Sequence, residues 1–340
     1  MWLWMKTAVL FVTLLGAGFT VADNAQAVEK NKSKSVSHKN KVAPVAKKSK
    51  PSQVVRKKKA SKVSVSGEKQ WQETRELAVQ SSAALVIEQG GGDELFLKNA
   101  SEVVPIASIT KLMTAMVVLD SQASLRGQIA ITDEDVDTLR GSRSRLRVGS
   151  GLTRENALLL ALMSSENRAA NALARHYPGG MSAFLTEMNI KAKVLGMKDT
   201  HFDDPTGLNS SNVSTARDLA KMVVAAYRYP LIREFTTTAE ATVDVSGRAM
   251  AYRNTNPLVK SAAWDVGLSK TGYIHEAGKC LVMQARVADK PVVIVLLDSA
   301  GKQTRVGDAN RIKRWMETTQ ASHRAATHAA LSRSSSGPPG

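Results

Sequence analysis

The chain has 340 residues, of which 43% are hydrophobic; this allows one large domain or two small ones and excludes a protein that is disordered throughout. The formal net charge is +17, but residues 29–69 hold 14 Lys or Arg against 2 Glu, so most of the excess belongs to one segment. The single cysteine, Cys280, excludes an internal disulfide. Because it lies in an expected strand, we expect it to fill the core.

Residues 1–27 have the layout of a secretory signal peptide. Lys6 precedes the apolar stretch TAVLFVTLLGAGFTV, and AQA at 25–27 supplies a small-x-small cleavage site. The apolar core is short for a membrane span, which makes an uncleaved anchor the less favoured alternative. We therefore expect the protein to be exported.

Residues 28–70 are rich in Lys, Ser and Val, contain no periodic pattern, and predict a disordered basic linker. A nucleic-acid-binding arm is disfavoured because no aromatic residues are interleaved to stack on bases and because export is expected. Weak contact with an anionic cell wall or lipid surface fits the composition better. At the other end, residues 319–340 predict a second disordered segment.

Between residues 71 and 318 the composition becomes globular. SSAALVIEQ and ELFLKNA flank the turn GGGD and predict a hairpin. A helix is expected from Ser108, and apolar spacing predicts four more, in TRENALLLALM, SENRAANALARHY, MSAFLTEMNIKAKVLG and TARDLAKMVVAAYRY. Strands return in VGLSKTGYI and in the hairpin CLVMQARVADKPVVIVLLDS, before a last helix in DANRIKRWMETT. This order predicts a mostly antiparallel sheet that both ends of the domain complete, with helices on its faces.

The segment PIASITKLMTAMVVL, at 105–119, places a serine and a lysine one helical turn apart at the start of an apolar run. Ser108 and Lys111 then share one helix face. An ammonium group so close to buried surface is costly unless a site requires it. The spacing by itself is not specific, because it also occurs at Ser66/Lys69 and Ser299/Lys302.

Two further motifs follow in chain order. Ser165-Glu166-Asn167 ends an apolar helix, and Lys270-Thr271-Gly272 lies in an expected strand. Each tripeptide is weak evidence when taken alone. Together with the Ser-x-x-Lys pair, in this order, they form the signature of serine acyltransferases that react with β-lactams.

The chemistry of such a site is coherent. Ser108 becomes a nucleophile only when a base takes its proton, and Lys111 can do so if its pKa falls. Burial, the charge of Lys270 and the positive end of the helix dipole would all lower that pKa. Ser165 could relay the proton to the leaving amine, and Asn167 could hold Lys111 and a substrate carbonyl.

The strand motif supplies groups for binding a peptide. Lys270 and Thr271 offer a cation and a hydroxyl to a substrate carboxylate, and Gly272 would let a peptide backbone lie against the strand edge. The backbone N–H groups of Ser108 and Tyr273 are the expected oxyanion donors.

These motifs resemble those of the low-molecular-weight penicillin-binding proteins, most closely the small serine D-alanyl-D-alanine endopeptidases. The resemblance covers most of residues 75–318 and is carried by ASITKLMTAMV, LLLALMSSENRAANALA, FDDPTGLNSSNVSTARDLAKMV and GLSKTGYIHEAGKCLVMQARVADKPVVIVLLDS. It implies an α/β class fold, the α/β/α sandwich of serine β-lactamases and transpeptidases. It also implies a periplasmic enzyme that cleaves D-alanine-containing peptides of peptidoglycan and is acylated by β-lactam antibiotics. By position, Arg305 resembles an arginine that helps bind the substrate carboxylate.

Neither a cofactor nor a metal is expected, because the six histidines show no ligand spacing such as H-E-x-x-H. Glu166 stands where many D-alanine carboxypeptidases carry glycine, and we expect the chain to lack the C-terminal β domain and membrane anchor of those enzymes; both features favour the endopeptidase branch. Three alternatives stay open: a D,D-carboxypeptidase, a β-lactamase, and a non-catalytic basic protein that binds the cell wall.

Overall fold

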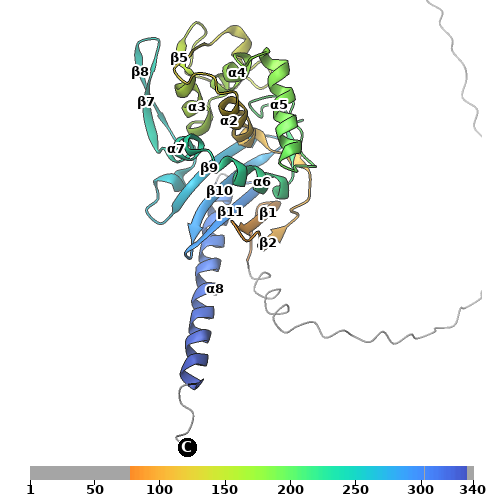
Figure 1. Ribbon diagram of the computed structural model, residues 1–340, viewed down its shortest axis with the longest axis vertical. Helices are drawn as coiled ribbons and strands as arrows, with labels where there is room; N and C mark the ends of the chain where they lie inside the picture. Colours follow the sequence, from red (N-terminus) through yellow and green to blue (C-terminus); the bar gives the residue numbers. More distant parts are fainter. Residues whose placement is uncertain (1–76, 302, 335–340) are drawn as a thin grey trace, which may run out of the picture. The chain divides into compact units, whose positions relative to one another are not determined.

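A five-stranded antiparallel sheet with the strand order β2-β1-β11-β10-β9 forms the centre of the computed structural model, which describes residues 77–301 and 303–334 (Figure 1). The first and last parts of the described chain meet in this sheet, since β1 pairs with β11. Its strands are β1 (Ala83–Glu88), β2 (Glu94–Lys98), β9 (Asp265–Ile274), β10 (Gly278–Val287) and β11 (Lys290–Ser299). Three two-stranded sheets comprise β3 (Val104–Pro105) with β6 (Val213–Ser214), β4 (Gln128–Ala130) with β5 (Gly151–Thr153), and β7 (Glu240–Val245) with β8 (Arg248–Arg253).

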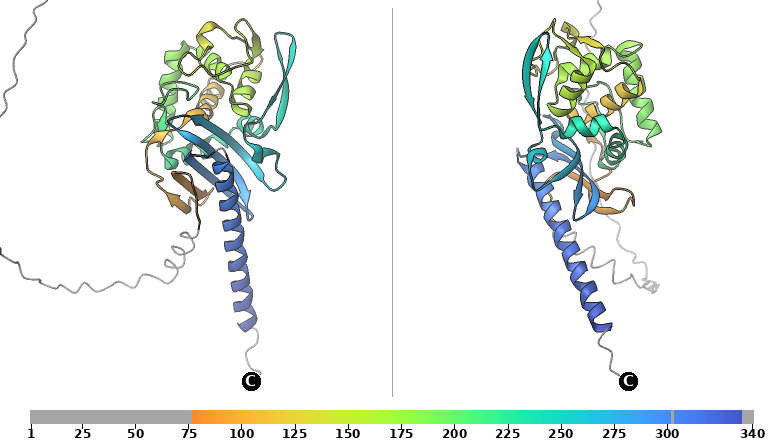
Figure 2. Two further views of the ribbon diagram at one scale, coloured as in Figure 1. Left: turned by 180° about the vertical axis from the view of Figure 1, so that it is seen from behind. Right: turned by 60° about the vertical axis from the view of Figure 1, so that its left-hand side comes forward.

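Helices cover both faces of the central sheet (Figure 2). Their bounds are α2 (Lys111–Asp120), α3 (Arg154–Met163), α4 (Asn167–Arg175), α5 (Gly180–Val194), α6 (Ala216–Ala226), α7 (Pro230–Thr237) and α8 (Thr304–Ser334), with 3-10 turns η1 (Ala107–Thr110), η2 (Asp133–Asp135) and η3 (Pro257–Lys260). Alternate residues of each strand enter different cores, as the pleat requires. In β11, Val293 and Val295 join the core beneath α6, and Ile294 and Leu296 join the core beneath α8.

The predicted α/β/α sandwich is therefore confirmed, as is a mostly antiparallel sheet closed by both ends of the domain. The sequence patterns did not predict the β7–β8 hairpin or the short helix α7. The strand β7, with the sequence EATVDV, alternates polar and apolar residues and buries one face, so a strand signal was present there. In β8, with the sequence RAMAYR, apolar residues fall on both faces and the alternation is lost.

The signal peptide expected at 1–27 and the basic linker expected at 28–70 lie outside the described residues. The disorder expected from residue 319 is wrong as far as Ser334, because α8 continues to that residue. The last part of that expected segment, residues 335–340, lies outside the described residues. Alanines and other helix-compatible residues dominate ASHRAATHAALS, which explains why a helix can persist there without an apolar stripe. Within the described part of the chain, no helix is both long and apolar enough to cross a membrane.

Two glycines allow the turn η1 to lie against its neighbours. A Cβ atom at Gly272 of β9 would come within 2.9 Å of the Ile106 carbonyl oxygen and 3.2 Å of the Ser108 nitrogen. A Cβ at Gly207, whose φ is +81°, would lie only 1.9 Å from the Ala107 carbonyl oxygen. The backbone that carries Ser108 is thus held between β9 and the loop around Gly207, and neither contact leaves room for a side chain.

Replacing Gly207 with alanine should displace the Ser108 turn. We expect a loss of about 3 kcal/mol in the free energy of unfolding, from backbone strain plus overpacking, measured by urea denaturation. Acylation by benzylpenicillin should slow at least tenfold. Gly247→Ala is the matched control, since Gly247 has a similar φ of +79° but open space around it. Equal effects of the two substitutions on acylation would contradict the role given to the close approach.

A buried carboxylate of α8, that of Asp308, holds the residues that precede β1. Asp308 accepts hydrogen bonds from the backbone N–H groups of Gln80 (2.9 Å) and Ser81 (2.7 Å) and from the Ser81 hydroxyl (2.6 Å), and it pairs with Arg311. These donors lower the pKa of the Asp308 carboxyl despite its burial. The charged form therefore joins the two ends of the domain.

Asp308→Asn should lower the free energy of unfolding by about 2 kcal/mol at neutral pH, because charge-assisted hydrogen bonds are lost. A carboxyl with a depressed folded-state pKa stabilises the fold above its unfolded pKa and loses that contribution as pH falls. The difference between the two proteins should consequently shrink as pH falls below the ordinary aspartate value of 3.8. Urea denaturation at several pH values tests this, and a difference that does not vary with pH would contradict it.

Candidate active site

The amine of Lys111 lies at the centre of the predicted motifs. It is completely buried at the first position of α2, directly after η1, which carries Ser108. Its Nζ lies 2.8 Å from Ser108 Oγ, 2.7 Å from Asn167 Oδ1 and 2.6 Å from the Thr206 carbonyl oxygen. The structure thus brings together the first two motifs and adds a backbone carbonyl that motif reasoning did not identify.

The Ser165-Glu166-Asn167 motif forms the turn between α3 and α4. The Asn167 amide nitrogen donates to Ser142 Oγ at 3.0 Å, an arrangement that directs its oxygen toward Lys111. The Ser165 hydroxyl accepts a hydrogen bond of 2.8 Å from Lys270 Nζ, which links this turn to β9. Ser142 belongs to no recognised motif, so only the folded arrangement reveals its role.

Burial changes the proton affinity of both lysines. It lowers the pKa of Lys111 from 10.5 to about 7, although the carboxylates of Asp204 and Glu166 act in the opposite direction. Burial also lowers the pKa of Lys270 well below 10.5, and the positive charges of Lys111 and Arg305 lower it further. A proton on one lysine therefore disfavours a proton on the other.

The loop that presents the Thr206 carbonyl is organised by Asp204. The Asp204 carboxylate accepts from the backbone N–H groups of Thr206 (2.5 Å), Gly207 (2.7 Å) and Asn209 (2.7 Å). Such repeated acceptance fixes a tight turn. The sequence signal was available in DDPTGLN, an aspartate followed by turn-forming residues, but it gave no indication that the turn reaches Lys111.

The third motif lies on β9, at the edge of the central sheet. The Thr271 hydroxyl is buried and donates to the hydroxyl of Thr255 at 2.7 Å, a partner that the sequence did not suggest. Gly272 lies beside the backbone nitrogen of Ser108. Its missing side chain therefore makes room for η1, rather than only for a bound peptide as the sequence analysis expected. Tyr273 is 58% exposed, and Lys279 Nζ lies 3.8 Å from its ring centre.

Arg305, at the start of α8, contacts the backbone of β9 and β10 beside the third motif. One of its terminal nitrogens donates to the carbonyls of Gly272 and Cys280, both at 3.0 Å. Its charge is close enough to lower the pKa of Lys270. Cys280 is fully buried, and burial raises the pKa of its thiol to about 11, as expected for a core residue.

Two of the residues with strained backbone lie at the predicted motifs. Ala107 has a φ of 48° and Ser165 a φ of 60°, in the left-handed region that residues with a Cβ rarely adopt. Each costs roughly 1–3 kcal/mol and persists only where the surroundings hold it in place. Ala107 precedes Ser108, and Ser165 belongs to the second motif, so strained backbone positions both hydroxyls.

Glu166 caps α4. Its side chain accepts from the backbone N–H of Arg168 at 3.3 Å, a common role for an acidic residue at a helix N-terminus. Across residues 77–301 and 303–334, no group of three or more His, Cys, Asp or Glu side chains is arranged to hold a metal ion.

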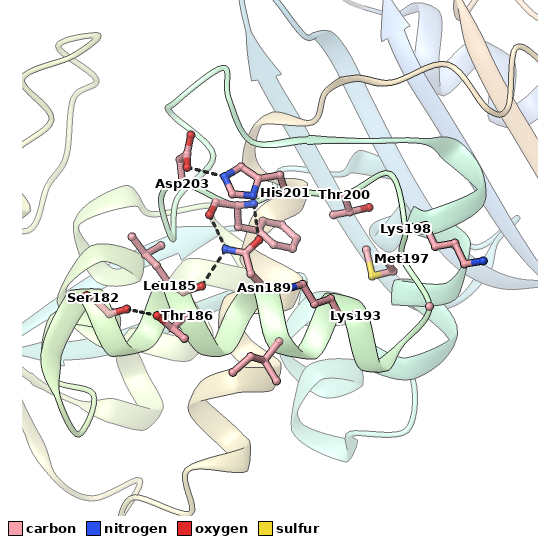
Figure 3. Close-up of a pocket in the computed structure, with 13 residues that line it drawn as sticks. Ser182, Leu185, Thr186, Asn189, Lys193, Met197, Lys198, Thr200, His201 and Asp203 are labelled. Carbon is pink, nitrogen blue, oxygen red and sulfur yellow. Dashed lines mark hydrogen bonds and ion pairs between the residues drawn. The ribbon is translucent and has the colours of Figure 1, made fainter.

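A separate hollow of about 760 Å³ lies along α5, away from these motifs (Figure 3). Its lining includes Asn189 and His201 but none of the predicted site residues. The Asn189 amide is fully engaged with the backbone of Leu185 and Phe202, and His201 pairs with Asp203. These two polar side chains of the hollow therefore already have partners.

Comparisons with known proteins agree with this arrangement. A family model described as D-alanyl-D-alanine carboxypeptidase, peptidase S11, matches residues 69–301. The chain is 51% identical over 242 residues to a D-alanyl-D-alanine endopeptidase of Pseudomonas aeruginosa, covering 71% of this chain and 78% of that protein. It is 46% identical, with the same coverage, to a D-alanyl-D-alanine endopeptidase of Escherichia coli.

Solved structures give the same result. The Streptomyces K15 DD-transpeptidase superposes with a TM-score of 0.66 at 31% identity, covering 70% of this chain and 97% of that chain. Penicillin-binding protein D2 of Listeria monocytogenes, solved in an ampicillin-bound form, superposes with a TM-score of 0.61 at 29% identity, over 70% of this chain and 98% of that one. Since the family model covers more than half of the sequence and the three motifs converge in space, this chain belongs to the D-alanyl-D-alanine carboxypeptidase family, peptidase S11.

Proposed function

We propose that the chain is a serine D-alanyl-D-alanine endopeptidase that cleaves peptide cross-links of peptidoglycan through an acyl-enzyme on Ser108. One observation carries the mechanism, namely the set of atoms around the Lys111 amine. With a pKa of about 7, this amine is neutral in a large fraction of molecules near neutral pH.

A neutral amine has two protons and one lone pair. Of the three partners of Lys111 Nζ, the Asn167 oxygen and the Thr206 carbonyl can only accept, whereas Ser108 Oγ can donate. The two protons therefore go to the first two partners, and the lone pair is left facing the Ser108 hydroxyl. This arrangement prepares Lys111 to act as the general base.

In the acylation step, Ser108 Oγ attacks the carbonyl carbon of the scissile amide while its proton passes to Lys111 Nζ. The C–O bond forms, the C–N bond then breaks, and the leaving amine receives a proton; Ser165, held by Lys270, is positioned to relay it. Water later cleaves the ester and restores the Ser108 hydroxyl. The backbone N–H groups of Ser108 and Tyr273 are the proposed oxyanion donors, because Gly272 brings β9 against the Ser108 nitrogen.

The substrate carboxylate would bind to the positively charged side chains near the end of β9. We assign this role to Lys270 and Thr271, with Arg305 close by. Because Thr271 donates to Thr255 in this structure, that hydroxyl pair has to reverse before Thr271 can donate to a carboxylate. When Lys111 is neutral, one source of repulsion on Lys270 disappears, and this favours the charged form of Lys270.

Endopeptidase activity is preferred over the alternatives for two reasons. The relatives at 51% and 46% identity are both D-alanyl-D-alanine endopeptidases. In addition, Glu166 caps α4, which gives it a structural role in place of the deacylating base that a β-lactamase would need.

We further propose a periplasmic location and weak contact of the basic segment 28–70 with anionic wall or lipid; both rest on the sequence.

Purified cross-linked muropeptide dimers provide the direct test. The wild-type protein should convert dimers to monomers and should form a stoichiometric adduct with benzylpenicillin on Ser108, located by intact-mass spectrometry and peptide mapping. Ser108→Ala should do neither while it remains folded. Release of terminal D-alanine without loss of dimers would support a carboxypeptidase, and rapid nitrocefin turnover would support a β-lactamase. Wall binding without adduct or cleavage would support the binding protein.

The acylation rate should follow the ionisation of Lys111. Because only the neutral amine accepts the proton, the second-order rate with benzylpenicillin should rise about tenfold per pH unit below 7 and level off above it. Stopped-flow or quenched mass spectrometry between pH 5.5 and about 8.5 measures this profile. Lys111→Arg should lower the plateau by about 10²-fold or more, whereas the exposed Lys260→Arg should match wild type. A flat wild-type profile would contradict Lys111 as the base.

A further inference from the structure

An arginine outside the three motifs contacts two other loops beside the site. Arg140 lies between η2 and β5, and its side chain is 23% exposed. Its Nε donates to the Leu208 carbonyl oxygen at 2.5 Å, and its Nη1 lies 2.9 Å from a carboxylate oxygen of Glu276. Glu276 belongs to the turn between β9 and β10. One guanidinium group therefore connects three loops that are far apart in the sequence.

The two loops that this guanidinium contacts belong to the segments that hold the Ser108 turn. Leu208 directly follows Gly207 in the sequence. Glu276 lies four residues beyond Gly272. These two glycines lie so close to the backbone of η1 that neither position has room for a Cβ atom. The contacts of the guanidinium thus link both segments that fix the nucleophile.

The loop that carries Arg140 also positions the proposed general base. Asp137 accepts hydrogen bonds from the backbone N–H groups of Arg140 (2.9 Å) and Ser142 (2.8 Å), which fixes the turn between them. Ser142 Oγ in turn accepts from the Asn167 amide, whose oxygen lies 2.7 Å from Lys111 Nζ. A displacement of this loop would therefore be transmitted to the amine through one serine and one asparagine.

The ion pair of Arg140 with Glu276 is partly open to solvent, since 45% of the Glu276 side chain is exposed. Pairs of this kind contribute little to stability. Their geometry matters more here, because the planar guanidinium binds a carbonyl and a carboxylate through different nitrogens and so sets the spacing of two loops.

We propose that Arg140 is a positioning residue for the acylation of Ser108. Its two contacts keep the Ser108 turn and the loop of Ser142 in one arrangement, so that the nucleophile and the base stay aligned. The inference rests on the proposed acyl-enzyme and extends it, since it gives an arginine outside the three motifs control over the acylation rate.

Saturation kinetics of acylation by benzylpenicillin test this assignment, because they separate the limiting acylation rate from the half-saturating concentration. Arg140→Ala should lower the limiting rate about tenfold through misalignment and should leave the half-saturating concentration within about twofold of wild type. Glu276→Gln should lower the limiting rate a few-fold, because the contact with Leu208 remains. The double variant should be no slower than Arg140→Ala, since both substitutions break one connection.

A charge swap gives a readout that a general loss of packing would not give. Arg140→Glu should slow acylation more than Arg140→Ala, because it places two carboxylates together. Adding Glu276→Arg should recover part of the rate by restoring the ion pair with its ends exchanged. Arg147→Ala is the matched control and should match wild type, because Arg147 is an exposed arginine of the same loop.

Urea denaturation identifies the variants that are folded at the assay temperature, and the exposed position of Glu276 keeps the test available if Arg140→Ala is not. A raised half-saturating concentration with an unchanged limiting rate would overturn the proposal, because Arg140 would then bind the ligand. Unchanged limiting rates in every folded variant, or a swap that recovers nothing, would also overturn it. Failure of the wild type to form an adduct on Ser108 would instead overturn the proposed function.

Discussion

The burial of the Lys111 amine beside Ser108 is the constraint on which the rest of the site depends. A lysine removed from water holds its proton weakly, and here the pKa falls to about 7. The same burial would be unfavourable without acceptors, so the Asn167 oxygen and the Thr206 carbonyl satisfy the two protons of the neutral amine. The lone pair of the neutral amine then faces the hydroxyl of Ser108, the proposed nucleophile.

The fold supplies these acceptors from segments far apart in the chain. Thr206 lies on a loop shaped by Asp204, Asn167 begins α4, and Ser108 lies on a turn held between Gly207 and Gly272. Strained backbone at Ala107 and Ser165 shows that packing fixes these positions against local preference. The proposed catalytic arrangement therefore depends on the whole domain and not on any single motif.

Much of this could be predicted from sequence because apolar spacing and the three motifs are local signals. The central strands, most of the helices and the convergence of Ser108, Lys111, Asn167 and Lys270 followed from them. The contributions of Thr206, Ser142 and Thr255 could not be predicted, since each depends on one backbone or hydroxyl atom whose position is set by tertiary contacts. The β7–β8 hairpin was not predicted although β7 alternates polar and apolar residues, because six residues are a short signal and β8 has apolar residues on both faces.

The most direct test of the account is a measurement of the pKa of Lys111 itself. Carbon-13 labelling of the lysine ε-carbons, with NMR titration of the intact protein, would resolve its signal, and Lys111→Arg and Lys270→Arg would assign the two buried lysines. The account predicts that the Lys111 signal titrates near pH 7. A Lys111 signal that stays protonated up to the ordinary lysine value of 10.5 would contradict a neutral general base beside Ser108.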